Sequence, residues 1–267
     1  MSFSSTRPVL TMGALAVGAL ALSAQPVQAT TPVGTLSMRA AGATGTVVAD
    51  ARQFSVIGDT SSDVAVAQVD GGTASLVRGP DADLPRAVRF PEYDPDGGYP
   101  RAVVSVTPTA GTALSPGDSD FEYGAVYRLD AVSSGRSEDN GDNVWQRGRY
   151  GDPAIFKLQL DHGYPSCLVK GSDGEVFARS RARLTPDTWY TTTCSRVGTT
   201  LTVAVRPYDD PAAVTTSVAV TGTSGTLTFA PTRPASIGGK LTSNGTSVAR
   251  SADQLNGAVA RVWVDRL

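Results

Sequence analysis

The chain has 267 residues, with 23 lysines and arginines against 25 aspartates and glutamates, so its formal net charge is only −2. A charge so close to balance excludes the strong positive field by which proteins attract nucleic acid or anionic lipid. No segment after the first 29 residues is long and apolar enough to span a bilayer. We therefore expect neither a nucleic-acid partner nor a membrane span.

The first 29 residues have the features of a secretory signal peptide. Arg7 supplies the positive start, an uncharged apolar run extends from Leu10 to Leu22, and small residues precede Thr30. A membrane anchor is the alternative, but the run is shorter than the roughly 20 residues that a spanning helix needs. We predict a secreted, extracellular protein in which residues 30–267, about 238 residues, form one domain.

The rest of the sequence is typical of short β-strands separated by turns. No sustained 3.6-residue apolar period follows the signal peptide, and Gly, Pro and Asp turns recur at short spacing. The clearest alternation lies in residues 121–130, where aromatic and aliphatic side chains share one face. The pattern predicts an all-β sandwich or barrel. In chain order, the expected strands cover 35–38, 64–69, 87–90, 101–107, 121–130, 144–145, 155–160, 176–178, 189–194, 201–205, 214–220, 227–229 and 258–264.

The two cysteines, Cys167 and Cys194, both lie where strands are expected. In an exported chain, two cysteines most simply form a disulfide. The alternative is a free catalytic thiol, which needs a histidine partner, and His162 is the one histidine in the sequence. We predict a disulfide between Cys167 and Cys194.

Four sequence stretches resemble a known fold family. They are GTLSMRAAGATGTVVADAR (34–52), RAVRFP (86–91), LTPDTWYTTTCSRVGTTLTVAV (184–205) and LNGAVARVWV (255–264). Together they resemble the concanavalin A-like lectin/glucanase superfamily, and in particular a secreted bacterial LamG-like (laminin G, pentraxin-type) jelly roll. The resemblance implies a two-sheet antiparallel β-sandwich. The closing strand has Ala260 and Arg261 where the family usually carries acidic residues, so those carboxylates are not carried over.

No catalytic constellation stands out in the sequence. His162 has no G-x-S-x-G serine to complete a triad, and too few His or Cys residues remain for zinc. Glu92 and the acids after it alternate as paired catalytic carboxylates would, but Pro95 and the following Asp-Gly-Gly are typical of a turn. We expect a non-enzymatic recognition module that binds carbohydrate or an extracellular protein surface through edge loops. A glycan-active hydrolase or lyase of the same superfamily is the alternative.

The candidate ligand-binding residues are aromatic side chains in or next to predicted loops. Aromatic faces stack on sugar rings while neighbouring amides and carboxylates bond to hydroxyl groups, although burial in the sandwich would explain each aromatic singly. The candidates are Tyr93, Tyr99, Trp145, Tyr150 and Tyr164.

The loop at residues 134–143 is rich in oxygen-bearing side chains. Glu138, Asp139 and Asp142 cluster there, and calcium is bound by oxygen ligands of this kind. Their spacing fits no EF-hand, and an ordinary polar loop tip is the alternative. We expect no cofactor, and calcium is the one that this loop could hold.

Overall fold

The computed structural model describes residues 35–58, 61–94, 99–110, 114–136, 139–210, 212–213, 215–242, 245, 248 and 251–267. Contacts divide the chain into two units, Met1–Thr30 and Thr31–Leu267, and every described residue belongs to the second. The predicted signal peptide, residues 1–29, lies outside the described residues. Within the described ranges, no helix has both the length and the apolar character needed to cross a membrane.

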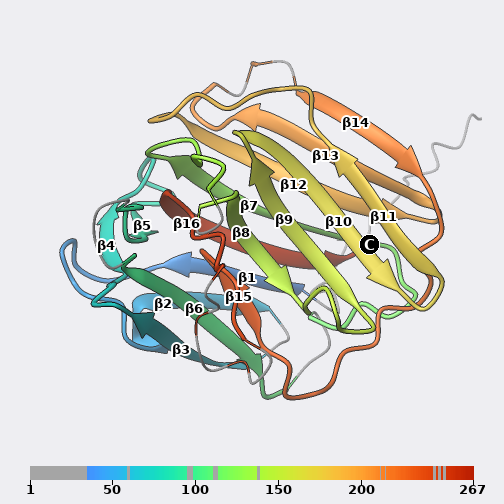
Figure 1. Ribbon diagram of the computed structural model, residues 1–267, viewed down its shortest axis with the longest axis horizontal. Helices are drawn as coiled ribbons and strands as arrows, with labels where there is room; N and C mark the ends of the chain where they lie inside the picture. The colour runs from blue at the N-terminus through green and yellow to red at the C-terminus, as the bar shows by residue number, and fades with distance from the viewer. Residues whose placement is uncertain are drawn as a thin grey trace, which may run out of the picture. The chain divides into compact units, whose positions relative to one another are not determined.

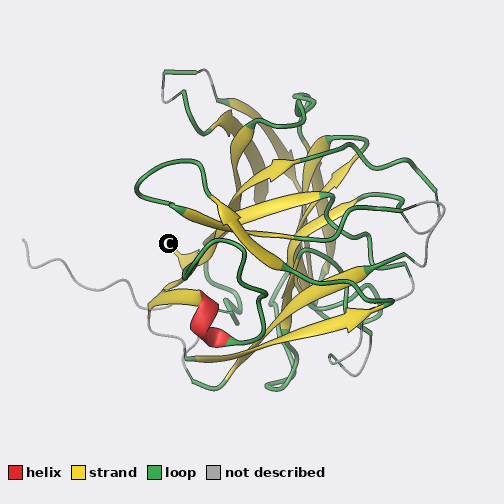
Figure 2. Cartoon of the chain, turned by 90° about the vertical axis from the view of Figure 1, so that its left-hand side faces the viewer, coloured by secondary structure: helices red, strands yellow, loops and turns green. Residues whose placement is uncertain are grey.

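Two antiparallel sheets make up the fold (Figures 1 and 2). The larger has nine strands. Its main path, from edge to edge, is β14 (Thr216–Thr221), β13 (Thr200–Pro207), β12 (Trp189–Val197), β7 (Phe121–Leu129), β16 (Gly257–Arg266), β1 (Thr35–Ala40) and β2 (Phe54–Gly58). Off this path, β5 (Arg86–Arg89) also pairs with β16, and β4 (Ser75–Arg78) pairs with β5.

The second sheet has seven strands. Its order is β11 (Gly174–Arg179), β10 (Tyr164–Gly171), β9 (Ile155–Asp161), β8 (Asp142–Arg147), β15 (Ala235–Ile237), β6 (Arg101–Pro108) and β3 (Ser62–Val69). The one helical segment in the described residues is the 3-10 turn η1 (Ala51–Gln53), coloured red in Figure 2. Asp50 caps this turn by accepting the Arg52 N–H at 2.8 Å.

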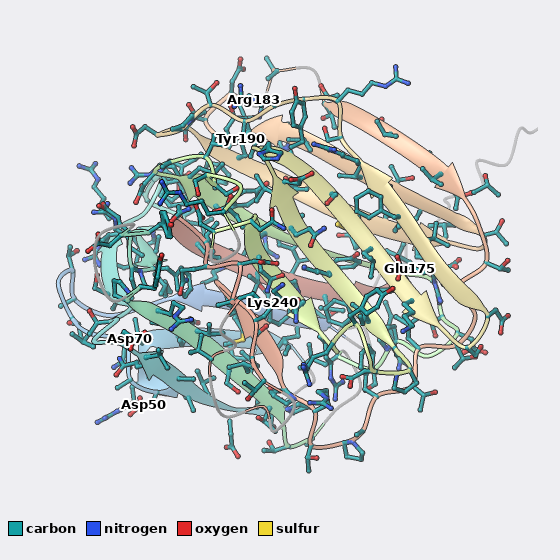
Figure 3. The ribbon with its side chains drawn as sticks, viewed as in Figure 1. Asp50, Asp70, Glu175, Arg183, Tyr190 and Lys240 are labelled. Carbon is teal, nitrogen blue, oxygen red and sulfur yellow. A yellow bond between two sulfur atoms is a disulfide. The ribbon has the colours of Figure 1, made fainter. Side chains whose placement is uncertain are left out.

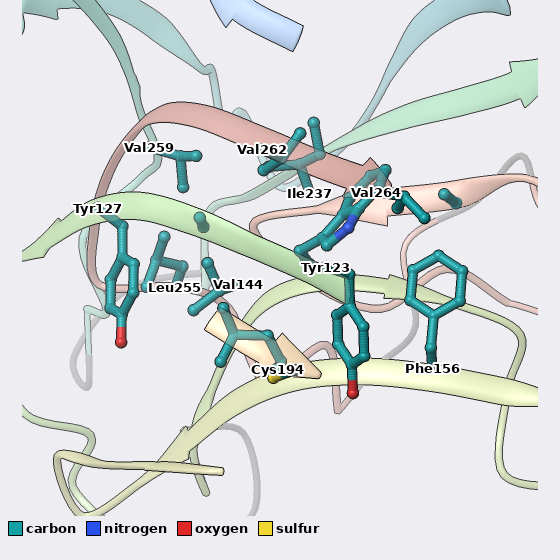
Figure 4. Packing of buried hydrophobic residues seen from close by; sticks show 14 of the residues in the cluster. Tyr123, Tyr127, Val144, Phe156, Cys194, Ile237, Leu255, Val259, Val262 and Val264 are labelled. Atoms are coloured by element: carbon teal, nitrogen blue, oxygen red, sulfur yellow. The ribbon is translucent and has the colours of Figure 1, made fainter. Parts of the chain in front are cut away.

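Alternation along the strands creates the core between the two sheets. On β7, Phe121, Tyr123 and Tyr127 are fully buried, whereas Glu122 and Arg128 on the opposite side are partly exposed. This is the division that the sequence pattern predicts. Figure 4 shows Tyr123 and Tyr127 packed with aliphatic side chains from both sheets. Burial of this apolar surface is the main favourable contribution to folding.

The predicted disulfide between Cys167 and Cys194 is confirmed, with a Cα–Cα distance of 5.6 Å. Cys167 lies on β10 of the seven-stranded sheet and Cys194 on β12 of the nine-stranded sheet, so the bond ties one sheet to the other. Both cysteines are fully buried in the core. The disulfide therefore fixes the position of β10 against the opposite layer.

Most of the predicted strands are present, and the all-β two-sheet sandwich is confirmed. One expected strand, at residues 227–229, is wrong, because Leu227 makes an isolated bridge to Gly117 and no continuous ladder. Three strands, β2, β4 and β15, were not predicted, and β10 was expected only as a strand around Cys167. These strands are short, carry exposed residues or contain proline, and each of these features obscures the alternation of apolar and polar residues.

Candidate functional site

A hollow of about 450 Å³ lies on the seven-stranded sheet. Its floor comes from neighbouring strands: Gln146 on β8, Lys157 and Gln159 on β9, and Leu168 on β10. Its rim comes from two connections, the β8–β9 turn and the segment between β15 and β16. The rim and remaining lining residues are Arg149, Tyr150, Ile155, Lys240, Leu241 and Ser251. Figure 3 labels Lys240, on the segment after β15.

The floor follows directly from the strand period. On β9, Phe156 and Leu158 are buried in the core, so Lys157 and Gln159 point to the other side of the sheet. Lys157 is paired in register with Gln146 on one side and with Leu168 on the other. Cross-strand neighbours in antiparallel sheets have adjacent side chains. The three therefore form a row across the floor.

A charged cluster occupies one side of this floor. The Asp253 carboxylate contacts the Lys240 ammonium and lies 3.9 Å from the Lys157 ammonium. Burial and, as the smaller cause, repulsion from Lys240 lower the pKa of Lys157 to about 8, while Asp253 opposes the change. Asp253 has a φ of 45°, and its carbonyl oxygen accepts the Asn143 N–H at 2.8 Å. The backbone thus holds this carboxylate at the floor.

Tyr150 lies at the rim and is the most exposed of the predicted aromatics, with an exposed fraction of 82%. The turn that carries it is closed by Asp152, whose carboxylate accepts the Arg149 N–H at 3.0 Å. Lys170 on β10 donates to the Tyr150 carbonyl oxygen at 2.8 Å, and its ammonium lies 5.4 Å from the ring centre. These contacts hold the turn against β10 and leave the ring largely open to solvent.

The other predicted tyrosines lie apart from this hollow. Tyr93 and Tyr99 stack on each other, with ring centroids 5.6 Å apart, and the Tyr93 N–H donates to Asn256 at 3.1 Å. Tyr164 packs under the Arg179 guanidinium at 4.9 Å. The five aromatics therefore do not form one surface, and Tyr150 is the member that lines the hollow.

The prediction that Trp145 contacts a ligand is wrong. Trp145 is fully buried and packs against Phe156 in the core, with ring centroids 6.0 Å apart. The register of β8 against β9 shifts between Asn143 and Trp145. This irregularity leaves the indole inside, beside the equally buried Val144.

The acidic loop is partly built into the protein interior. Asp139 accepts the Asn256 Nδ2–H at 2.8 Å and the Ser134 N–H at 2.6 Å, and Asp142 accepts the Asn256 N–H at 2.9 Å. These carboxylate oxygens therefore accept hydrogen bonds from backbone and side-chain amide groups. Among the described residues, no group of three or more His, Cys, Asp or Glu could hold a metal ion. Glu138 lies outside the described residues. Calcium binding by this loop stays a prediction.

A second hollow, of about 420 Å³, lies on the nine-stranded sheet and contains a carboxylate pair that the sequence reasoning missed. Glu122 on β7 and Asp265 on β16 are directly opposite each other in the strand register. Burial raises the pKa of Glu122 and, separately, that of Asp265. The alternation of β7 predicts that Glu122 faces outward. Its partner is 143 positions further on, and no local pattern indicates which strand lies beside β7.

Trp263 positions the Glu122 carboxylate. Its indole N–H donates to Glu122 Oε1 at 3.2 Å, and the Arg261 guanidinium lies 5.0 Å from the centre of the indole. The ring lies over Gly124, where an added Cβ would come within 2.4 Å of it. The close approach of the indole to β7 therefore requires glycine at this position.

No model of a known protein family matches the chain, and no curated protein sequence does. Solved structures similar to it include domains LG4-5 of the mouse laminin α1 chain, at 17% identity and a TM-score of 0.36, over 55% of this chain and 34% of that one. The LG1-3 region of the laminin α2 chain matches at 10% identity and a TM-score of 0.42, over 88% of this chain and 62% of that one.

The binding domain of Paraclostridial Mosquitocidal Protein 1 matches at 10% identity and a TM-score of 0.47, over 77% of this chain and 43% of that one. This chain thus spans less than two thirds of each of the three structures. All three TM-scores lie below 0.5, and no property of these proteins follows for this chain.

Proposed function

We propose that the chain is a secreted, non-enzymatic recognition module that binds carbohydrate through the hollow on the seven-stranded sheet. The observation that carries the proposal is the exposed ring of Tyr150 at the rim of a concave floor that bears amide and ammonium groups. Sugar rings pack an apolar face on an aromatic ring and direct their hydroxyl groups to polar side chains. A volume of about 450 Å³ lies within the roughly 300–1,000 Å³ of small-molecule sites.

The floor offers the polar groups that such a ligand needs. Gln146 and Gln159 each carry a carboxamide, which both donates and accepts hydrogen bonds. Leu168, the cross-strand neighbour of Lys157 on β10, adds an apolar patch. The floor is built on paired strands, so its polar groups are held in place before a ligand arrives.

The proposal that the module is secreted draws on two features. The interior disulfide between Cys167 and Cys194 is typical of proteins that fold in an oxidising compartment. The apolar run near the start of the sequence supports export by the same route. An extracellular protein surface is the alternative partner, and it would also approach the rim at Tyr150.

The experiment is a glycan array with the purified protein, run once with calcium and once with chelator. Hits are then measured by calorimetry with Tyr150→Ala and, as a control, Val197→Ala, which truncates an exposed apolar side chain on β12 of the other sheet. We expect Tyr150→Ala to weaken binding about three- to tenfold, from the 0.5–1.5 kcal/mol of an aromatic contact, and Val197→Ala to leave it unchanged. An array without hits, or equal effects of the two variants, would contradict the proposal.

A glycoside hydrolase is the second candidate function, and the carboxylate pair on the nine-stranded sheet favours it. Retaining glycosidases hold two carboxyl groups about 5–5.5 Å apart, and directly opposed residues on neighbouring strands have Cβ atoms about 4.5–5.5 Å apart. A raised pKa on Glu122 suits a general acid. The test measures reducing ends released from a polysaccharide panel by the wild type and by Glu122→Gln. We expect binding without hydrolysis; release that is lost in Glu122→Gln would establish the enzyme instead.

A further inference from the structure

The hollow on the seven-stranded sheet is more positively charged than the protein around it. Arg149, Lys157 and Lys240 line it, and its described lining includes no aspartate or glutamate. Next to this lining, the Asp253 carboxylate contacts Lys240 and lies 3.9 Å from the Lys157 ammonium. Three cations against one anion stand out in a chain whose formal net charge is −2. The charge is therefore concentrated at this site.

Lys157 is the cation whose position is fixed by strand pairing on both sides. Its side chain has an exposed fraction of 13%, and it extends from the middle of β9 between Gln146 and Leu168. At 3.9 Å, Asp253 is too far to accept a hydrogen bond from its ammonium. Removing an ammonium group from water costs free energy, and only a closely placed counter-charge offsets that cost. Lys157 shares its one nearby carboxylate with Lys240, so much of its cost is not offset. A second anion in the hollow would supply such a counter-charge.

We propose that the hollow selects acidic sugars, with the carboxylate or sulfate of the ligand placed against the Lys157 and Lys240 ammonium groups and a sugar ring packed on Tyr150. The inference rests on the proposed function and names its ligand class. Hydrogen bonds between an ammonium and an anionic oxygen are about twice as strong as neutral ones. The apolar surroundings of the floor reduce dielectric screening and strengthen the attraction. Arg149 at the rim adds a third positive charge.

The test compares three oligosaccharides of equal length by calorimetry: a neutral galactan, an oligogalacturonate with carboxylates only, and a carrageenan oligomer with sulfates only. We expect at least one acidic oligosaccharide to bind about tenfold or more tightly than the neutral one, as a charged hydrogen bond implies. The two acidic arms distinguish a carboxylate ligand from a sulfate ligand.

Two variants remove a positive charge inside the hollow, and a third removes one elsewhere. Lys157→Gln and Lys240→Gln should reduce affinity for the acidic ligand about tenfold, to the level of the neutral one. Arg206→Gln, on the nine-stranded sheet, changes the net charge equally and should leave the preference intact. Thermal melting of each variant separates a lost contact from a lost fold.

The outcomes separate the two proposals. If the neutral and acidic oligosaccharides bind equally and Tyr150→Ala weakens both, the recognition module stands and the acidic preference is overturned. If Arg206→Gln abolishes the preference as strongly as Lys157→Gln does, the selectivity belongs to the overall charge and the proposed placement is overturned. If no oligosaccharide binds and the glycan array is empty, both proposals fail.

Discussion

The hydroxyl group of Tyr123 donates a hydrogen bond to the carbonyl oxygen of Lys157, at 3.2 Å, across the interior of the sandwich. The carbonyl oxygen of Leu168 lies 2.9 Å from the same hydroxyl. Burial raises the pKa of Tyr123 well above its usual value, so the donor proton is retained. Lys157 and Leu168 both line the hollow. A core residue of one sheet therefore holds the backbone that positions the candidate site on the other.

Tyr123→Phe should destabilise the protein while preserving its packing. The substitution removes the donor and leaves the ring, so we expect the free energy of unfolding in urea to fall by about 1–2 kcal/mol. Tyr190→Phe is the control, because the Tyr190 hydroxyl accepts a hydrogen bond from the Thr185 N–H at 3.2 Å in a more exposed setting. A Tyr123→Phe variant as stable as the wild type would show that the hydroxyl contributes nothing across the interior.

The disulfide should contribute more than any one hydrogen bond. Cys167 and Cys194 are separated by 27 positions. Closing a loop of this size lowers the entropy of the unfolded chain, which stabilises the folded protein by about 3–4 kcal/mol in the loop-entropy description. We expect Cys167→Ala/Cys194→Ala to lose about that much stability in urea. Adding a reductant to the wild type in the unfolding experiment should have a similar effect, and should leave the double variant unchanged. Equal stability of oxidised wild type and double variant would contradict this expectation.

Strand alternation was enough to predict much of the core and one side of the site. The pattern of β7 and β9 places Tyr123 and Phe156 inside, and it therefore places Lys157 and Gln159 outside. What the pattern omits is which strands are neighbours. Lys240 comes from the connection between β15 and β16 and reaches the floor because the three-residue β15 inserts between β8 and β6.

The missed carboxylate pair has the same physical origin. Glu122 and Asp265 meet because β16 lies beside β7, and that pairing is decided by packing of the whole sandwich. Trp145 illustrates the opposite error. Its position next to a polar loop indicates exposure, but the register shift in β8 turns its indole inward. Irregular pairing of this kind leaves no periodic signal in the sequence.

Asp142 should make the protein less stable as the pH rises toward neutrality. Burial, together with repulsion from Asp139 and Asp253, raises its pKa to about 7, although the hydrogen bond from the Asn256 N–H opposes the change. The folded state therefore holds the proton more tightly than the unfolded chain, whose aspartates titrate near pH 3.9. The contribution of Asp142 to the free energy of unfolding is fully present below about pH 4 and is lost as the pH rises to about 7.

Asp142→Asn tests this dependence, because the amide keeps an oxygen for the Asn256 N–H and carries no charge. Relative to the wild type, the variant should gain stability between pH 5 and pH 8, measured by urea unfolding at each pH. Asp209→Asn removes the same charge from an exposed position and serves as the control. A difference between Asp142→Asn and the wild type that stays constant with pH would contradict the prediction.

Affinity for acidic oligosaccharides should decline as the pH rises through about 8. The pKa of Lys157 is lowered to about 8, first by burial and then by Lys240, while Asp253 opposes the change. Below that pH the ammonium is charged and attracts the ligand, and above it the free protein must take up a proton to bind. Affinity should therefore be level from pH 6 to 7 and fall by at most about tenfold per pH unit beyond 8. Calorimetry from pH 6 to 9.5 measures this profile. In Lys157→Gln the affinity should be lower and the decline should be absent, and a wild-type affinity that stays constant to pH 9.5 would exclude Lys157 from the binding of the anion.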